Sequence, residues 1–168
     1  MTLDVYVADE QADHPVNVER WSGLARSVLE AEGIGSDTEV SLLFVDETTI
    51  GALNERFLHI EGPTDVLAFP IEDEGDHSGR SPDEGGTGPG SIESDTSPVV
   101  LLGDVVVCPA VAARNAGDHG VTFDDEIALL VVQGILHLLG MDHEADAEAE
   151  RMERREQQLL SRFYRAPS

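Results

Sequence analysis

Apolar and polar residues follow regular patterns along most of this chain, and these patterns predict its secondary structure. Runs rich in β-branched and aromatic residues, with alternating or continuous apolar positions, are typical of β-strands. They predict strands at 3–8, 39–46, 64–70 and 99–108. Apolar residues at helical spacing predict helices at 18–33, 47–57, 110–120, 123–139 and 151–165. The sequence therefore predicts an α/β (α+β) fold, with one mixed sheet of about four strands covered by helices.

One of these helices is far more apolar than the others and is expected at the centre of the domain. The segment IALLVVQGILHLL at 127–139 has almost no polar face, which is typical of a helix buried on most sides. Thr122 and Asp125 form a capping-box pattern directly before it, so the helix can begin near Phe123. Gly140 is expected to end it, because glycine readily adopts the left-handed conformation found after helices.

A different composition marks residues 72–98. This segment contains six Gly, five Ser, three Pro and eight acidic residues, with almost no apolar side chains. Such a segment cannot bury enough apolar surface to offset the entropy lost on ordering. We therefore expect a single domain over 1–168 that carries a disordered acidic insert at 72–98, between the third and fourth strands.

Composition and charge exclude several classes of protein. The 168 residues include 34 acidic and 10 basic residues, all of the latter arginine, and the net charge is −24. So negative a molecule is not a general basic clamp for nucleic acids, and DNA is not an expected partner. Cys108 is the only cysteine, which excludes a disulfide scaffold, and its apolar strand favours a core position. No apolar run reaches the length of a membrane span and no secretory leader is visible, so we expect a cytoplasmic protein.

The apolar helix also carries a pattern that is typical of a metal centre. Gln133 and His137 are four residues apart, so their side chains lie on one helical face, one turn apart. After the stop at Gly140, the chain returns with Asp142 and His143. In the pattern H-x-x-x-H-x-x-G-x-x-H, three histidines bind zinc, and the glycine lets the third reach the same metal. Gln133 replaces the first histidine, and its neutral amide oxygen is a poorer zinc donor than imidazole.

Other interpretations of this helix are a core histidine and a protease. A single histidine on an apolar helix is more often a hydrogen-bonded core residue than a ligand, but two histidines that flank a glycine favour the metal. Zinc proteases of the H-E-x-x-H type carry a glutamate directly after the first ligand, as the base that activates water. Gly134 occupies that position, so the sequence argues against a protease.

Three segments of the sequence resemble the YbeY family of bacterial endoribonucleases. QGILHLLGMDH at 133–143 resembles the family signature H-G-x-L-H-L-x-G-Y-D-H. GPTDVLAFP at 62–70 resembles the family's P-T-D-V-L-S-F-P strand, and LLGDVVVCP at 101–109 resembles its L-G-D-I-V-I-C segment. The order and spacing of the three segments also agree. With the flanking elements, the resemblance covers essentially the whole chain.

The resemblance implies a single-strand-specific, zinc-dependent endoribonuclease with one Zn²⁺ per chain. It assigns five residues to the metal turn: the ligands His137 and His143, Gln133 in the place of the first ligand, and the supporting Gly140 and Asp142. It also implies that Arg56 is a catalytic residue that contacts RNA phosphate. Family members are taken to mature the 3′ end of small-subunit (16S) ribosomal RNA and to act in ribosome quality control. The implied partners are ribosomal RNA, the small ribosomal subunit and assembly factors.

The glutamine leaves several alternatives open. In the first alternative, Gln133 binds the zinc through its amide oxygen. In the second, a water molecule takes the place of the Gln133 ligand. In the third, a nearby donor such as Asp142, His59 or His119 replaces it. With zinc bound, the pKa of its water would fall towards about 7 and Arg56 would hold the scissile phosphate, the ribose 2′-hydroxyl being the alternative nucleophile. Two other functions are a ribosome-associated assembly factor with a decayed metal site, and a metal-dependent hydrolase of small phosphoesters or amides.

Overall fold

The computed structural model describes residues 3–34, 37–71, 100–141 and 146–164, and the predicted insert at 72–98 lies outside them. The described elements follow one another in the order β1 (Leu3–Asp9), α1 (Val18–Ala31), β2 (Thr38–Phe44), α2 (Glu47–Leu58), β3 (Val66–Pro70), β4 (Val100–Val107), α6 (Pro109–His119), α7 (Phe123–Leu138) and α8 (Asp146–Phe163). Among these helices, none has both the length and the apolar character needed to cross a lipid bilayer.

The strands form one mixed four-stranded sheet, which confirms the predicted fold class. Their order in the sheet is β1-β2-β4-β3. β2 pairs in parallel with β1 and with β4, whereas β3 pairs antiparallel with β4. In the described sheet, β1 and β3 are therefore the edge strands, and residues 71–99 connect two neighbouring antiparallel strands.

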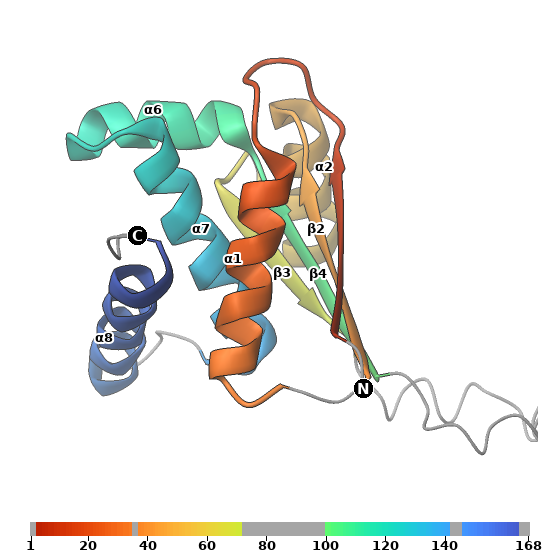
Figure 1. Ribbon diagram of the computed structural model, residues 1–168. Coiled ribbons are helices and arrows are strands. Elements are labelled where there is room, and N and C mark those ends of the chain that lie inside the picture. The colour runs from red at the N-terminus through yellow and green to blue at the C-terminus, as the bar shows by residue number, and fades with distance from the viewer. Residues whose placement is uncertain (1–2, 35–36, 72–99, 142–145, 165–168) are drawn as a thin grey trace, which may run out of the picture.

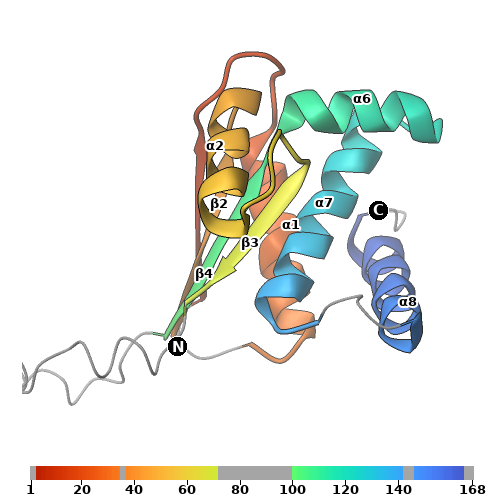
Figure 2. The same ribbon diagram turned by 180° about the vertical axis from the view of Figure 1, so that it is seen from behind.

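Helices cover both faces of the sheet (Figures 1 and 2). α1 and α7 lie side by side on one face, α8 packs on the outside of α7 and α1, and α2 lies on the opposite face. α6 starts at the end of β4, extends away from the sheet above the beginning of α7, and leads into α7. α7 is thus enclosed between the sheet and α8, and 10 of its 16 residues are buried. This arrangement confirms the central buried helix that the apolar run predicts.

Successive side chains of a strand point to opposite faces of the sheet, and each face has its own apolar core. On β2, Val40, Leu42 and Phe44 are buried towards α1 and α7. A smaller cluster on the α2 face contains Val45, Ile50, Leu67, Val106, Cys108 and Val111. Cys108 is fully buried directly before α6, which confirms its predicted core position, and burial raises the pKa of its thiol.

Local polar signals set several element boundaries. The Asp46 carboxylate accepts a hydrogen bond from the Thr49 N–H at 2.8 Å and caps α2, so β2 ends at Phe44 rather than at the predicted residue 46. α8 begins at Asp146, five residues before its predicted start at 151. Asp146 and Glu148 lie in its first turn, where negative charge is stabilised by the helix dipole.

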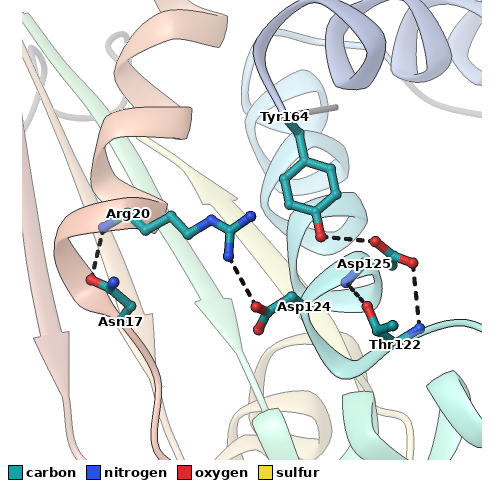
Figure 3. A network of polar contacts seen from close by, with 6 residues as sticks. All are labelled: Asn17, Arg20, Thr122, Asp124, Asp125 and Tyr164. Carbon is teal, nitrogen blue, oxygen red and sulfur yellow. Dashed lines mark hydrogen bonds and ion pairs between the residues drawn. The ribbon is translucent and has the colours of Figure 1, made fainter. Parts of the chain in front are cut away.

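A polar network fastens the beginning of α7 to α1 and α8 (Figure 3). Thr122 Oγ1 accepts a hydrogen bond from the Asp125 N–H at 3.0 Å, and the Asp125 carboxylate accepts one from the Thr122 N–H at 3.3 Å. This reciprocal pair confirms the predicted capping box. The Asp125 carboxylate also accepts a hydrogen bond from the Tyr164 hydroxyl at 2.8 Å, while Arg20 pairs with Asp124 at 2.9 Å. The first turn of α7 therefore holds both neighbouring helices in place.

Tyr164→Phe is expected to lower the free energy of unfolding by about 1 kcal/mol, because it removes the hydrogen bond to Asp125. Burial, followed by the hydrogen bond to Asp125, raises the pKa of Tyr164 from 10.0 to about 12. Since the folded-state pKa is the higher one, this stabilisation is present below about pH 10 and is lost as the pH rises through about 12. Denaturant unfolding of wild type and variant at neutral and alkaline pH measures this loss in the free energy of unfolding. Tyr6→Phe, at a side chain 53% exposed, is the control, and an equal loss in both variants at neutral pH would contradict the prediction.

Candidate metal centre

The predicted helix stop is present at the C-terminal end of α7. α7 ends at Leu138, and Gly140 follows with a φ of 97°, in the left-handed region. The Gly140 N–H donates to the His137 carbonyl, and the Met141 N–H donates to the Leu136 carbonyl, both at 3.0 Å. This pair of bonds is a Schellman motif, in which a glycine ends a helix and turns the chain. The chain therefore turns away from the axis of α7 after Leu138, as the metal pattern requires.

The same turn orients the ring of His137. Nδ1 of His137 lies 3.0 Å from the carbonyl oxygen of Met141. A carbonyl oxygen only accepts hydrogen bonds, so Nδ1 carries a hydrogen, and in the neutral imidazole Nε2 then carries the lone pair. Histidines that bind metals commonly donate their other ring N–H to a carbonyl or carboxylate, which fixes the tautomer. His137 thus has the tautomer and the anchoring of a zinc ligand.

Gln133 lies one turn before His137 and contacts α8. An interaction with Gln133 lowers the pKa of the Glu156 carboxyl group. Burial has the larger and opposite effect, and the pKa of Glu156 is raised to about 7. Glu156 is only 5% exposed. A cavity of about 200 Å³ lies beside the pair and is lined by Gln133, Ala149, Met152, Glu153 and Glu156.

Sequence reasoning did not identify Glu156 as a residue of this site, although α8 carried a signal. Met152, Leu159 and Leu160 form the buried apolar stripe of α8. Glu156 is four residues after Met152 and three before Leu159, so it falls on the same face. A carboxylate on the buried face of an amphipathic helix indicates a polar partner in the neighbouring element.

Two of the alternative metal donors do not lie near His137. Nδ1 of His119 lies 3.0 Å from Oε1 of the buried Glu126, in the first part of α7. Glu126 and His137 are separated by about 16 Å along the helix axis, at about 1.5 Å per residue. His59 is the left-handed C-cap of α2, on the opposite face of the sheet. Neither histidine can replace the first ligand.

The described residues supply two of the donors expected of a zinc site. Asp142 and His143 lie outside the described residues, so their roles remain predictions. Within the described part of the chain, no three His, Cys, Asp or Glu side chains are grouped closely enough to hold a metal. An anchored imidazole and an amide oxygen one helical turn apart nevertheless fit zinc, which takes nitrogen and oxygen donors. The predicted His143 would be the next donor.

Arg56 belongs to a different helix, α2. It is in the last turn of α2, with its guanidinium carbon 5.3 Å from the centre of the Phe57 ring. α2 and α7 lie on opposite faces of the sheet (Figure 2). The side chains of Arg56 and His137 therefore belong to elements on opposite faces of the sheet.

Gly134 determines how closely α7 approaches the sheet. It is buried in α7 opposite Val105 of β4. A β-carbon added at 134 would overlap Cγ1 of Val105 and lie 3.2 Å from its Cγ2, and Val105 is itself fully buried. Position 134 thus faces the sheet, whereas Gln133 faces α8. A catalytic glutamate of the protease type has no room at this position.

Comparisons with known proteins agree with the resemblance found in the sequence. A family model described as endoribonuclease YbeY matches residues 6–164. A protein named endoribonuclease YbeY from Frankia casuarinae is 41% identical over 159 residues, which cover 95% of this chain and 74% of the relative. Its namesake from Moorella thermoacetica is 36% identical over 162 residues, which cover 95% of this chain and 96% of the relative. A solution structure from Thermotoga maritima, at 24% identity, has the same fold with a TM-score of 0.57 and covers 95% of this chain and 89% of that one.

Proposed function

Because this chain belongs to the YbeY family of endoribonucleases, we propose that it is a hydrolase that cleaves single-stranded RNA in a zinc-dependent reaction. The observation that carries the proposal is the orientation of His137, whose Nδ1 is held by the Met141 carbonyl so that Nε2 carries the lone pair. Maturation of the 3′ end of small-subunit ribosomal RNA and ribosome quality control are the proposed roles. Both come from the family resemblance.

We assign the metal to His137 Nε2, the amide oxygen of Gln133 and the predicted ligand His143. When bound, zinc would lower the pKa of its water towards about 7 and polarise a phosphoryl oxygen. The Met141 carbonyl keeps the imidazole of His137 in one tautomer and one orientation. Arg56 is exposed at the end of α2, and its guanidinium would bind a phosphate of the same RNA strand near the β3 edge.

The charge of the chain bears on how RNA reaches this site. A net charge of −24 repels free RNA. Proteins that bind RNA without help neutralise phosphates with clusters of basic side chains. We therefore propose that ribosomal partners in the cytoplasm, namely the small subunit and its assembly factors, bring the RNA to the enzyme in the cell, whereas the purified enzyme needs an excess of free RNA.

Removal of the metal is expected to stop cleavage. The purified protein is incubated with an end-labelled single-stranded RNA and with a duplex of the same sequence, before and after treatment with a chelator. We expect cleavage of the single strand alone, loss of cleavage in the chelator, and recovery when zinc is added back. Undiminished cleavage by protein that elemental mass spectrometry shows to be free of zinc would contradict the proposal.

A further inference from the structure

Large apolar side chains are exposed together where α2 ends. Phe57, Leu58 and Ile60 are 51%, 49% and 54% exposed, and we call these three residues the α2 patch. Large apolar side chains are usually buried, and a group of exposed ones is typical of a surface that binds a partner. The family resemblance assigns a role here to Arg56 alone. The α2 patch therefore calls for a binding partner of its own.

The aromatic ring of the α2 patch is held against the sheet. The ring centres of Phe57 and Phe69 lie 5.3 Å apart and their planes meet at 60°, which is an edge-to-face contact. Phe69 belongs to β3 and packs against the buried cluster between the sheet and α2. An aromatic side chain has only two rotatable bonds, so little entropy is lost when a partner binds to it. Phe57 thus presents a half-exposed flat surface with a fixed support.

Arg56 places one positive charge beside this ring. Its guanidinium carbon lies 5.3 Å from the centre of the Phe57 ring, and among the described residues no carboxylate forms an ion pair with it. Glu55 and Glu61 are exposed nearby in the sequence, so the surroundings are not basic as a whole. The site therefore offers a flat apolar ring and one available cation. This combination fits a nucleotide, whose base is flat and whose phosphate is negative.

The α2 patch and the candidate metal centre lie at the same end of β3. A β-carbon added at Gly103 would overlap the carbonyl oxygen of Phe69 and lie 2.9 Å from Cδ2 of Leu138. Leu138 is the last residue of α7 and directly follows His137. β3 is an edge strand of the described sheet. The Phe57 ring and the metal end of α7 are therefore separated by the thickness of the sheet at one of its edges.

We propose that Phe57 is a base-stacking residue of the RNA site, which holds one unpaired base against its ring while Arg56 contacts the adjoining phosphate. The inference rests on the proposed function, from which it takes single-stranded RNA as the substrate. Stacking requires a flat ring and no charge, so it operates even on a chain with a net charge of −24. A base inside a duplex is already stacked and paired, so the ring selects unpaired RNA.

RNA affinity tests the stacking role. Purified wild type and variants are titrated into a fluorescently labelled single strand of mixed sequence, whose integrity is checked by electrophoresis, and anisotropy reports binding. Phe57→Leu keeps an apolar side chain without the ring and is expected to weaken binding by about 5-fold to 100-fold. Phe57→Trp should bind at least as well as wild type. Tyr6→Leu is the control, because Tyr6 is an aromatic residue 53% exposed on β1, the other edge strand, and its affinity should match wild type.

Fluorescence observes the contact itself. A base that stacks on a tryptophan quenches its emission, so RNA should quench Phe57→Trp and leave Tyr6→Trp unchanged. The native Trp21 is 1% exposed and gives the same background in both variants. Salt dependence separates the two side chains of the site. Arg56→Gln should reduce the slope of log affinity against log salt by about 0.7, the value for one phosphate contact with a single strand, whereas Phe57→Leu should not change it.

Several results would overturn the stacking role. One is unchanged RNA affinity in Phe57→Leu, and another is an equal loss in Tyr6→Leu. A third is a Phe57→Trp emission that RNA does not quench. Self-association of wild type that Phe57→Leu abolishes without any change in RNA affinity would also overturn it, because that result assigns the α2 patch to a second copy of the chain.

Cleavage measured on the same preparations separates this inference from the proposed function. A stacking contact made equally before and during the reaction changes KM rather than kcat, so Phe57→Leu should raise KM and leave kcat close to wild type. Wild type that cleaves single-stranded RNA, beside a Phe57→Leu variant of normal affinity and KM, would overturn the stacking role alone. Wild type that binds RNA through Phe57 without cleaving it would overturn the nuclease function alone.

Discussion

His137→Ala is expected to abolish zinc binding and to lower the cleavage of single-stranded RNA by at least about 100-fold. Loss of a residue that only supports a metal ligand costs up to about that factor, and loss of a ligand removes the metal itself. Elemental mass spectrometry of the purified variant measures the zinc, and an end-labelled RNA measures the cleavage. The fold is expected to persist, because His137 is half-buried at the very end of α7.

Two companion variants make this result specific. His59→Asn changes an exposed histidine on the other face of the sheet and should leave zinc content and cleavage unchanged. Gln133→His adds the imidazole expected at the first ligand position and should tighten zinc binding. A wild type without zinc, beside a Gln133→His variant with one zinc per chain, would contradict the zinc-dependent activity. That outcome would indicate an assembly factor with a decayed metal site.

Gly134→Ala is expected to lower the free energy of unfolding by about 1–3 kcal/mol, although alanine is the better helix former. The new methyl group would overlap Cγ1 of Val105, which is fully buried and has no space to retreat into. α7 must then move away from β4, and the turn that holds His137 moves with it. Denaturant unfolding measures the loss of stability, and zinc affinity should fall in parallel.

The control for this prediction is a glycine with the same secondary structure and free space around it. Gly23 lies within α1, and an added β-carbon there would meet nothing within 4 Å. Gly23→Ala should therefore raise stability by up to about 1 kcal/mol. Val105→Ala, made together with Gly134→Ala, should restore part of the lost fit, so the two losses should not add. A Gly134→Ala variant as stable as Gly23→Ala would contradict the close packing.

Much of the fold was predictable because its signals are local. Thr122 and Asp125 cap α7 as their spacing indicates, and Gly140 adopts the left-handed conformation that ends it. Both depend on residues within one or two turns, so no tertiary information is needed. The central position of α7 was likewise predictable, because a helix without a polar face must be enclosed by other elements. The sheet followed from the number and composition of the strands.

What sequence reasoning missed depends on contacts between distant elements. Glu156 lies near Gln133 only because α8 packs against α7, and neither segment alone indicates which residue is the partner. The first turn of α8 is polar, so its helical pattern became visible only from Met152 onwards. The role of Arg56 comes from its position in the family and stays a prediction; the structure shows only that α2 and α7 lie on opposite faces of the sheet.

The burial of Cys108 has a consequence for studying the motions of this protein. It is the only cysteine and is fully buried at the end of β4, where its N–H donates to the Asp65 carbonyl at 2.9 Å. A thiol reagent can reach its sulfur only while this part of the sheet opens. The rate of labelling in native buffer therefore measures how often this part of the sheet opens, and no engineered probe is needed. The same burial keeps two folded chains from being joined through a disulfide bond.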